Sequence, residues 1–214
     1  MISLWIILEV LAAYLIGSIP SALWVGKLFY GIDIRQHGSG NAGATNVIRV
    51  FGYKAGVPVM IFDIFKGWLA VQLAVWINPG DFTGDPLIYL RVIMGIAAVI
   101  GHVFPVFAGF RGGKGVGTFA GVGIALFPLA LLIVLGVFIV VLAITHYVSL
   151  SSIIGSLVFP FAAILIEHQQ NPALVALSLM VAIFIPFTHR KNIRRLLKGE
   201  ENKFLFKRKK QGSS

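Results

Sequence analysis

The 214-residue chain contains no cysteine, and only eight of its residues are Asp or Glu. Without cysteine, disulfide bonds, thiolate nucleophiles and cysteine-bound metals are all excluded. Charged residues make up 12% of the chain, whereas about 25% is usual for a soluble domain. Hydrophobic residues make up 57%, and the mean hydropathy is +0.90. These values predict an integral membrane protein.

Three catalytic patterns are also missing. The chain has no H-x-E-x-x-H or other dense spacing of metal ligands, so we expect no metal site and no cofactor. It has no G-x-S-x-G, the turn that exposes a nucleophilic serine in many hydrolases. No histidine is followed five residues later by aspartate, which excludes the H-x4-D pattern of many acyltransferases.

The net charge of +10 is concentrated near the C-terminus. Ten of the 18 Lys and Arg residues lie between Arg190 and Lys210, after the last apolar run. A basic cluster in that position is typical of a cytoplasmic flank beside anionic lipid, not of a groove for nucleic acid. We expect residues 1–203 to form a single membrane-embedded domain and residues 204–214 to form a basic tail.

Apolar runs predict about seven transmembrane helices, because about 20 mostly apolar residues are needed to cross a bilayer. The first run, Ile2 to Tyr30, should bend near Gly17 and Pro20, since proline removes a hydrogen bond within a helix. The run Gly115 to Tyr147 is too long for one span and contains Pro128, so we expect two short helices there. The other four runs are Val57 to Ile77, Leu87 to Val106, Leu150 to Ile166 and Ala173 to Phe187. The predicted fold class is an all-α integral membrane protein.

The basic residues between these spans predict the orientation. Three Lys and Arg residues fall between the first and second spans, two fall between the third and fourth, and the large cluster follows the last. The loops Asn78 to Pro86 and Glu167 to Pro172 contain none. The positive-inside rule then places the N-terminus outside and the C-terminus in the cytoplasm, which requires an odd number of spans.

The unusual polar stretches all fall on the cytoplasmic side in this topology. Irregular polar segments at membrane depth persist only where protein buries them or where they line a wet cavity. We therefore expect them to converge on one site. The stretches are residues 39–49, Asp63 with Lys66, His102, and residues 111–115, 146–152 and 189–195.

Two glycine-rich segments suggest an anion site. "HGSGNAGATN" (residues 37–46) matches G-x-G-x-x-G, but it follows a membrane helix and not a strand, which excludes a dinucleotide-binding unit. "GFRGGKGVGTFAG" (residues 109–121) resembles a P-loop but lacks its first glycine and the Ser or Thr after Lys114. Glycine-rich backbone can turn successive N–H groups toward phosphate oxygens, best at the start of a helix.

The residues in and near these segments supply the chemistry that a phosphate-bearing substrate needs. We expect the N–H groups of Gly112, Gly113 and Gly115 to cradle a phosphate, Lys114 and Arg49 to supply charge, and uncharged side chains to bind hydroxyl groups. The uncharged candidates are Ser39, Asn41, Thr45, Asn46 and Asn192.

Each candidate also has a structural interpretation. Gly117 and Gly121 are four residues apart, a spacing that lets membrane helices pack closely, and we favour that explanation for them. Asp63 and Lys66 are one helical turn apart and are expected to pair, although Lys66 stays a substrate-binding candidate. His102 and His189 lie beside the polar face and can be either interfacial or catalytic.

Three long motifs carry a family resemblance. They are "GSIPSALWVGKLFYGIDIRQHGSGNAGATNVIR" (residues 17–49), "GHVFPVFAGFRGGKGVGTFAG" (residues 101–121) and "HRKNIRRLLKGEENK" (residues 189–203). With "FDIFKG" (residues 62–67) and "YVSLSSI" (residues 147–153), they resemble the bacterial acyl-phosphate:glycerol-3-phosphate acyltransferases, the PlsY family. The resemblance extends over nearly the whole chain up to about Lys203.

The resemblance implies an activity and a location. It implies transfer of a fatty acyl group from acyl phosphate to the 1-hydroxyl of glycerol 3-phosphate, which gives lysophosphatidic acid and phosphate for phospholipid biosynthesis. It implies a multi-pass enzyme of the bacterial cytoplasmic (inner) membrane whose active site faces the cytoplasm. We find no extramembrane segment large enough to recognise CoA or acyl carrier protein, so we expect neither to be required.

The resemblance and the polar residues singled out above together give candidate roles to particular residues. Lys114, His102 and His189 are the catalytic candidates, and Asp63 and Glu201 are expected to be structural. The substrate-binding candidates are Ser39, Asn41, Thr45, Asn46, Arg49, Lys66, Gly112, Gly113, Gly115, Ser149 and Asn192.

Two questions stay open at this point. The proton of the attacking hydroxyl can pass to a substrate phosphate oxygen or to a histidine, His102 or His189. A different class of protein, an anion transporter, would also use glycine-rich phosphate sites. The polar groups gather at one face and not at the midplane, and the sequence has no evident internal repeat, so we favour the enzyme.

Overall fold

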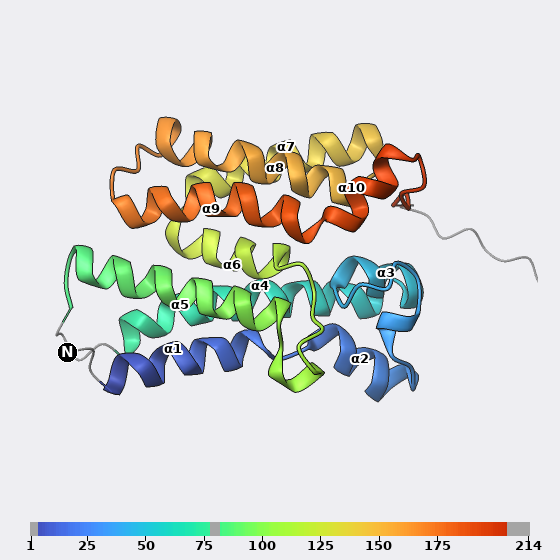
Figure 1. Cartoon of the computed structure of the whole chain (residues 1–214), viewed down its shortest axis with the longest axis horizontal. Coiled ribbons are helices and arrows are strands. Elements are labelled where there is room, and N and C mark those ends of the chain that lie inside the picture. The colour runs from blue at the N-terminus through green and yellow to red at the C-terminus, as the bar shows by residue number, and fades with distance from the viewer. Residues whose placement is uncertain (1–3, 78–81, 205–214) are drawn as a thin grey trace, which may run out of the picture.

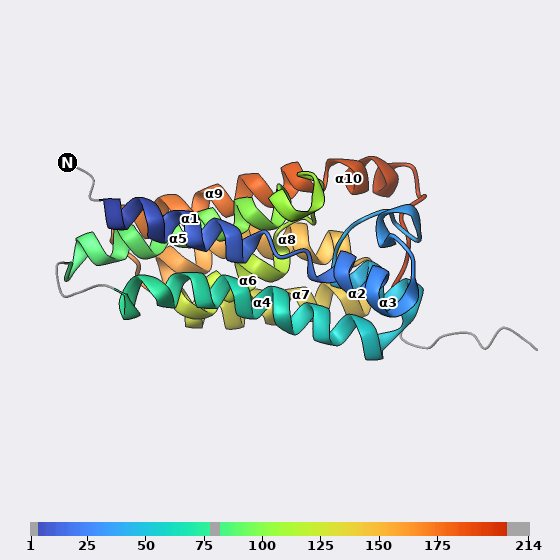
Figure 2. The ribbon, with the colours of Figure 1, turned by 90° about the horizontal axis from the view of Figure 1, so that it is seen from below.

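The computed structural model describes residues 4–77 and 82–204, and all regular structure in these ranges is helical. The long helices lie side by side along one direction (Figures 1 and 2). The short helices α2, α3 and α10 gather at one end of this bundle, and α1 begins at the other end (Figure 1). The all-α prediction is confirmed for the described part of the chain.

The first apolar run forms two helices, α1 (Leu4–Gly17) and α2 (Ser21–Tyr30), which meet at an angle of 42°. The predicted bend is therefore confirmed. Lys66 Nζ donates a hydrogen bond of 3.0 Å to the Ile19 carbonyl at this break. Gly17 is needed here, because a Cβ atom at that position would lie 2.0 Å from the Ala98 carbonyl oxygen.

The centre of the bundle is built from α4 (Tyr53–Trp76) and α5 (Asp85–Val103), which pack against α1 through buried Ala13, Ala70 and Ala98. Small residues let membrane helices approach closely. The 3-10 turn η1 (Ile34–Gln36) and α3 (Ala44–Phe51) lie between α2 and α4, and a second 3-10 turn, η2 (Val106–Ala108), follows α5. These segments carry the two glycine-rich loops to the same end of the bundle.

The long apolar run near Pro128 forms α6 (Val116–Leu126) and α7 (Pro128–Thr145), which meet at Phe127 as expected. With 11 residues, α6 extends about 16 Å at 1.5 Å per residue, roughly half of a 30 Å hydrocarbon core. At this break, side chains form hydrogen bonds with backbone groups of both helices. Arg91 Nη2 donates to the Ala125 carbonyl at 2.9 Å, and Glu167 Oε2 accepts from the Ala130 N–H at 3.0 Å.

The last layer contains α8 (Val148–Phe161), its π-helical continuation η3 (Ala162–Ile166), α9 (Pro172–Thr188) and α10 (Arg190–Leu197). Helix α10 turns away from α9 by 60°. Four helical stretches are long and apolar enough to cross a membrane, or up to six if each bent pair is one span. The seven predicted runs all appear as helices, but the number that crosses the bilayer stays a prediction because α6 is short.

The surface of α7 shows why this chain needs lipid. Ala130 is the one buried residue of this 18-residue helix, and Ile144, on its outer side, is 74% exposed.

Three predictions fall partly outside the described residues: the beginning of the first run at Ile2, part of the loop after Ile77, and residues 205–214 of the basic tail.

Candidate active site

A cavity of about 340 Å³ lies between α3, α4, α6, α7, α8, α9 and α10, and His102 of α5 also lines it. One end is polar and the other is apolar. The polar lining residues include Ser39, Asn41, Thr45, Arg49, Lys114, Ser149, His189, Asn192 and Glu201. The apolar lining residues include Phe119, Val122, Phe127, Leu131, Val134, Phe138, Phe159, Leu177 and Val181. Each of the predicted polar stretches contributes residues to this cavity, although Lys66, Gly112 and Gly113 line a separate, smaller one. The shape of the large cavity suits an amphiphilic molecule.

Lys114 belongs to a buried polar network that joins the second glycine loop to α8 and α10. Its Nζ atom donates to Asn192 Oδ1 at 2.5 Å, and Asn192 Nδ2 donates to Glu201 Oε1 at 2.6 Å. Ser149 and Arg195 also donate to the Glu201 carboxylate, each at 2.8 Å. Burial lowers the pKa of Lys114 to about 8, against the opposing effect of the Glu201 charge. The Glu201 carboxylate thus accepts hydrogen bonds from three side chains, and its structural role stays a prediction.

The N-terminus of α6 faces the same cavity. Gly115 is its N-cap residue with φ +84°, a left-handed conformation that favours glycine. No side chain among the described residues caps this helix end. Gly115, Val116 and Gly117 line the cavity beside Lys114. Free N–H groups and the positive end of the helix dipole make this end of α6 a suitable place for an anion.

Gly112 and Gly113 differ from the expectation. Their N–H groups already donate to the carbonyl oxygens of Val103 and His102, at 3.1 and 3.2 Å, so they do not face a phosphate. Both residues line a much smaller neighbouring cavity, of about 10 Å³. A Cβ atom on Gly112 would lie 2.0 Å from the His102 carbonyl oxygen, and one on Gly113 would lie 2.2 Å from His102 Nε2. These glycines are therefore required for close packing against His102.

Asn46 holds the first glycine loop in shape. Its side-chain oxygen accepts from the Ser39 N–H at 2.8 Å, and its Nδ2 atom donates to the carbonyl oxygens of Ile34, His37 and Asn41, at 2.9 to 3.1 Å. The amide is therefore occupied by the loop, although Asn46 lines the cavity. Direct binding of substrate by Asn46 stays a prediction, and the structure gives it a positioning role.

Asp63 and Lys66 form the predicted pair, with Nζ and Oδ1 2.7 Å apart and both side chains buried. Ser21 Oγ also donates to Asp63 at 2.8 Å. His102 Nδ1 lies 3.6 Å from Asp63 Oδ1 and has no hydrogen-bond partner among the described residues. Lys66 lines the small cavity and not the large one, so its binding of substrate stays a prediction.

His189 has the geometry of a proton acceptor. Its Nδ1 atom lies 2.8 Å from the Ile185 carbonyl oxygen, a contact that requires the proton to be on Nδ1. The neutral ring then has an unprotonated Nε2 atom. The residue lines the large cavity with 3% of its surface exposed. Between the two histidines, His189 is the one whose local hydrogen bond selects the tautomer that a base needs.

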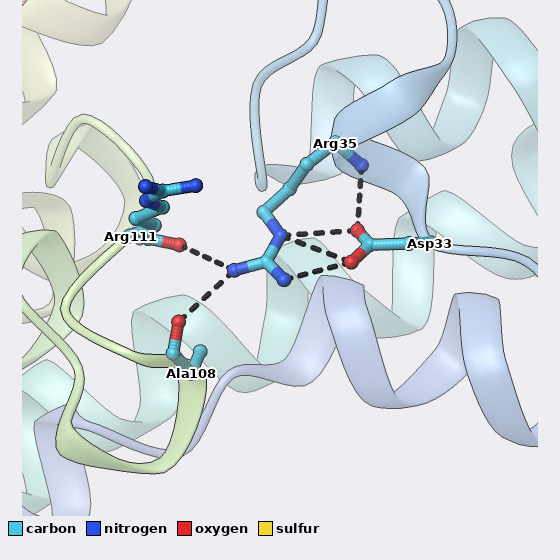
Figure 3. A network of polar contacts seen from close by, with 4 residues as sticks. All are labelled: Asp33, Arg35, Ala108 and Arg111. Carbon is cyan, nitrogen blue, oxygen red and sulfur yellow. Dashed lines mark hydrogen bonds and ion pairs between the residues drawn. The ribbon is translucent and has the colours of Figure 1, made fainter.

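Sequence reasoning missed a clamp that joins the two glycine-rich loops (Figure 3). Asp33 and Arg35 form an ion pair of 2.7 Å, and Arg35 Nη1 donates to the carbonyl oxygens of Ala108 and Arg111, at 3.0 and 3.3 Å. In the sequence, Arg35 is one of the three basic residues between the first two predicted spans, and it indicates only the orientation of the chain. An acid and a base two residues apart in a loop are a signal of local pairing, but the carbonyl partners are 73 and 76 residues away.

The fold and this cavity define a membrane-embedded protein with a buried site for a molecule that has an anionic head and an apolar tail. Comparisons with known proteins agree with this class. Residues 7–199 match the model of the family described as glycerol-3-phosphate acyltransferase. The chain belongs to the glycerol-3-phosphate acyltransferase family.

Curated relatives match along most of their length. The glycerol-3-phosphate acyltransferase of Chlorobaculum tepidum is 42% identical, with 94% of this chain and 97% of the relative covered. That of Salinibacter ruber is 45% identical, with 90% and 89% covered.

Two solved structures are similar in fold. Both are crystal structures of PlsY, an integral membrane glycerol 3-phosphate acyltransferase, and both are 36% identical, with 94% of this chain and 96% of theirs covered. The glycerol 3-phosphate form has a TM-score of 0.83, and the lysophosphatidic acid form has a TM-score of 0.80. The match to an integral membrane protein agrees with the predicted fold class.

Proposed function

We propose that this protein transfers a fatty acyl group from acyl phosphate to the 1-hydroxyl of glycerol 3-phosphate, giving lysophosphatidic acid and inorganic phosphate. The observation that carries the proposal is the two-ended cavity, whose polar end holds Lys114, Arg49 and the start of α6 and whose other end is apolar. The names of the family and of its solved members support glycerol 3-phosphate as acceptor and lysophosphatidic acid as product.

In the proposed complex, the acyl chain of the donor lies among α6, α7, α8 and α9. Its phosphate lies at the N-terminus of α6 and beside Lys114. This helix end replaces the cradle first expected from Gly112 and Gly113. An acyl phosphate is compact, so a helix end, a cation and an apolar slot are sufficient to bind it. This arrangement supports a donor that needs neither CoA nor acyl carrier protein.

Glycerol 3-phosphate is proposed to lie at the loop that Asn46 shapes, with its phosphate near Arg49 and its hydroxyl groups near Ser39 and Asn41. Its 1-hydroxyl oxygen attacks the donor carbonyl carbon and forms a new C–O bond. The bond from that carbon to the bridging phosphate oxygen then breaks, and inorganic phosphate leaves. Holding both substrates in line removes much of the entropic barrier, and Lys114 or the α6 N–H groups stabilise the oxyanion.

The hydroxyl proton has two proposed destinations, a phosphate oxygen of the substrate or Nε2 of His189. A phosphate acceptor needs no protein base, because the leaving group of an acyl phosphate is already good. Replacement of His189 by Gln separates the two. A loss of about 100-fold or more in kcat with unchanged thermal stability would assign the proton to His189. Retention of kcat would assign it to the substrate.

The main experiment is a turnover assay on the purified full-length protein in detergent. Palmitoyl phosphate and glycerol 3-phosphate are supplied with chelator and without CoA, and phosphate and lysophosphatidic acid are measured. We expect both products in equal amounts, only when glycerol 3-phosphate is present. Lys114→Met should abolish turnover, whereas Lys54→Met, at an exposed site on α4, should not. Efficient turnover with palmitoyl-CoA, or loss of activity with chelator, would contradict the proposal.

We also propose that the site faces the cytoplasm of a bacterial inner membrane. The support is that α10 carries the basic residues Arg190 to Arg195 at the end of the bundle where the polar end of the cavity lies (Figure 1). Basic segments are retained on the cytoplasmic side.

A further inference from the structure

The apolar end of the cavity closes at one level on all the helices that surround it. Its deepest lining residues are Phe127 between α6 and α7, Leu131 on α7, Phe159 on α8 and Leu177 on α9. The rings of Phe127 and Phe159 pack edge to face with their centroids 5.0 Å apart. Phe127 is 1% exposed, and Phe159 is 7% exposed. The two rings form a floor between α6 and α8.

Beyond this floor, buried apolar side chains continue the same core. Ala130, Ala162 and Leu174, which lie farther from the polar end on α7, η3 and α9, are buried in the same core cluster. In the part of the chain that the structure describes, they do not line the cavity. The floor is therefore backed by buried core side chains.

The position of Phe127 follows from the break that ends α6. Phe127 is the C-cap of α6 and the N-cap of α7, with φ −143° and ψ 58°, and Pro128 follows it as the first residue of α7. The backbone at this break is held by Arg91 and Glu167. The ring is thus fixed at a constant distance from Gly115, at the other end of α6.

The depth of the slot corresponds to a particular chain length. Gly115 and Phe127 are twelve residues apart, and Ser149 and Phe159 are ten residues apart, which corresponds to ~15–18 Å at 1.5 Å per residue. An extended acyl chain advances about 1.25 Å per carbon, since its C–C bonds are ~1.5 Å long and zigzag. The slot therefore holds about 12 to 14 carbons beyond the carbonyl. A myristoyl chain matches this length, and a stearoyl chain exceeds it.

We infer that Phe127 and Phe159 set the upper limit on the length of the acyl chain that this enzyme transfers. The inference rests on the proposed function and adds a substrate class to it, saturated donors of medium to long chain with a cut-off below stearoyl. Each methylene group that fits into the slot is buried from water, which raises kcat/KM about fourfold. The first carbon that meets the rings gains none and strains a packed core.

The test compares donors in parallel on the full-length protein. Lauroyl, myristoyl, palmitoyl and stearoyl phosphate are each turned over with glycerol 3-phosphate, and kcat/KM is measured for each. Phe127→Ala removes the floor, and Phe127→Leu is the milder version if the first variant folds poorly. Ser156→Leu fills the slot one turn before Phe159 and should act in the opposite direction. Phe161→Ala is the matched control, because Phe161 is two residues from Phe159 but 65% exposed.

We expect the ratio of stearoyl to myristoyl turnover to rise about tenfold or more in Phe127→Ala. The optimum should move toward lauroyl in Ser156→Leu and stay unchanged in Phe161→Ala. Active variants that keep the wild-type chain profile would overturn the inference. General damage to the fold would lower all donors together and would not move the ratio.

A second measurement keeps this test separate from the proposed function. Lysophosphatidic acids of the same chain lengths are added to the protein, and the shift in unfolding temperature is recorded for each. A chain-length optimum that moves in Phe127→Ala and Ser156→Leu supports the floor even if no acyl phosphate is turned over. Absence of turnover with every acyl phosphate would contradict the proposed function alone. An optimum that does not move would contradict the floor alone.

Discussion

Lys114 changes its charge within the range of ordinary assays, because burial lowers its pKa to about 8 in the substrate-free protein. Below that pH the ammonium group is charged and attracts phosphate. Above it the group loses its proton, so binding of an anion must first restore the charge. A phosphate group is mostly a dianion above its second pKa of about 6, so its own charge does not change near pH 8.

We therefore expect the affinity for glycerol 3-phosphate, a phosphate monoester, to be nearly constant from about pH 7 to pH 8. It should then fall by up to tenfold for each further pH unit. Titration calorimetry across this range measures the effect. Lys114→Arg is the control, since a guanidinium group stays charged throughout and should remove the fall. A wild-type affinity that does not change up to pH 10 would show that Lys114 does not bind the anion.

Glu201 offers a second test at this scale, because its carboxylate accepts hydrogen bonds from Ser149, Asn192 and Arg195. In Glu201→Gln the amide can no longer accept on both sides, and it faces the Arg195 donor with a donor of its own. We expect a loss of about 1–3 kcal/mol in the free energy of unfolding. Thermal unfolding in detergent measures it, with exposed Glu200→Gln as the neutral control. Equal stabilities of the two variants would remove Glu201 from its structural role.

How well a site residue could be predicted depended on how near its contact partners lie in the sequence. Lys114, Ser149, Asn192 and Glu201 lie in separate segments of the sequence, and the structure brings them into one hydrogen-bond network. The family resemblance had made Lys114, Asn192 and Glu201 candidates, and their roles stay predictions. The error over Gly112 and Gly113 has a physical cause. A glycine that approaches a ligand and a glycine that approaches the protein's own backbone look alike in sequence. The position of His102 beside these two glycines is set by the tertiary fold and cannot be read from the sequence.

At the scale of helices, the pair of Asp63 and Lys66 connects α4 to the break between α1 and α2. Lys66 bonds to both Asp63 and the Ile19 carbonyl, and both charged side chains are buried. Lys66→Met leaves the buried Asp63 carboxylate without its ammonium partner, and we expect a loss of about 3–5 kcal/mol in unfolding free energy. The double variant Asp63→Asn with Lys66→Met should recover part of that loss. Losses that simply add in the double variant would show that the two groups are not coupled.

The positions of proline and the lengths of the apolar runs predicted most helices from the sequence, but they did not predict the geometry of these helices. The bend near Pro20 and the division at Pro128 follow from a missing N–H group and are local effects. Helix α3 and the turn of α10 are short and amphipathic, so a search for spans does not find them. The caps that Arg91 and Glu167 provide come from other helices, and composition contains no sign of them.

At the scale of the whole molecule, orientation is the property that a reporter experiment can decide. A cytoplasmic reporter fused after Ser214 should be active, and a tag placed before Met1 should be accessible from outside intact cells. The physical reason is that the basic residues lie at one end of the bundle, and α1 begins at the other (Figure 1). A protected N-terminal tag would contradict the predicted odd number of spans.

The one-sided placement of the polar end has a consequence for the membrane as a whole. In the proposed complex, a product with one acyl chain has its head group at the polar end of the cavity and its tail among α6 to α9. It can reach the leaflet on the side of the polar end without turning over. All newly made lipid then enters the same leaflet, which gains area while the opposite leaflet gains none. A bilayer fed by such sites stays balanced only if other proteins carry lipid across it as fast as these sites add it.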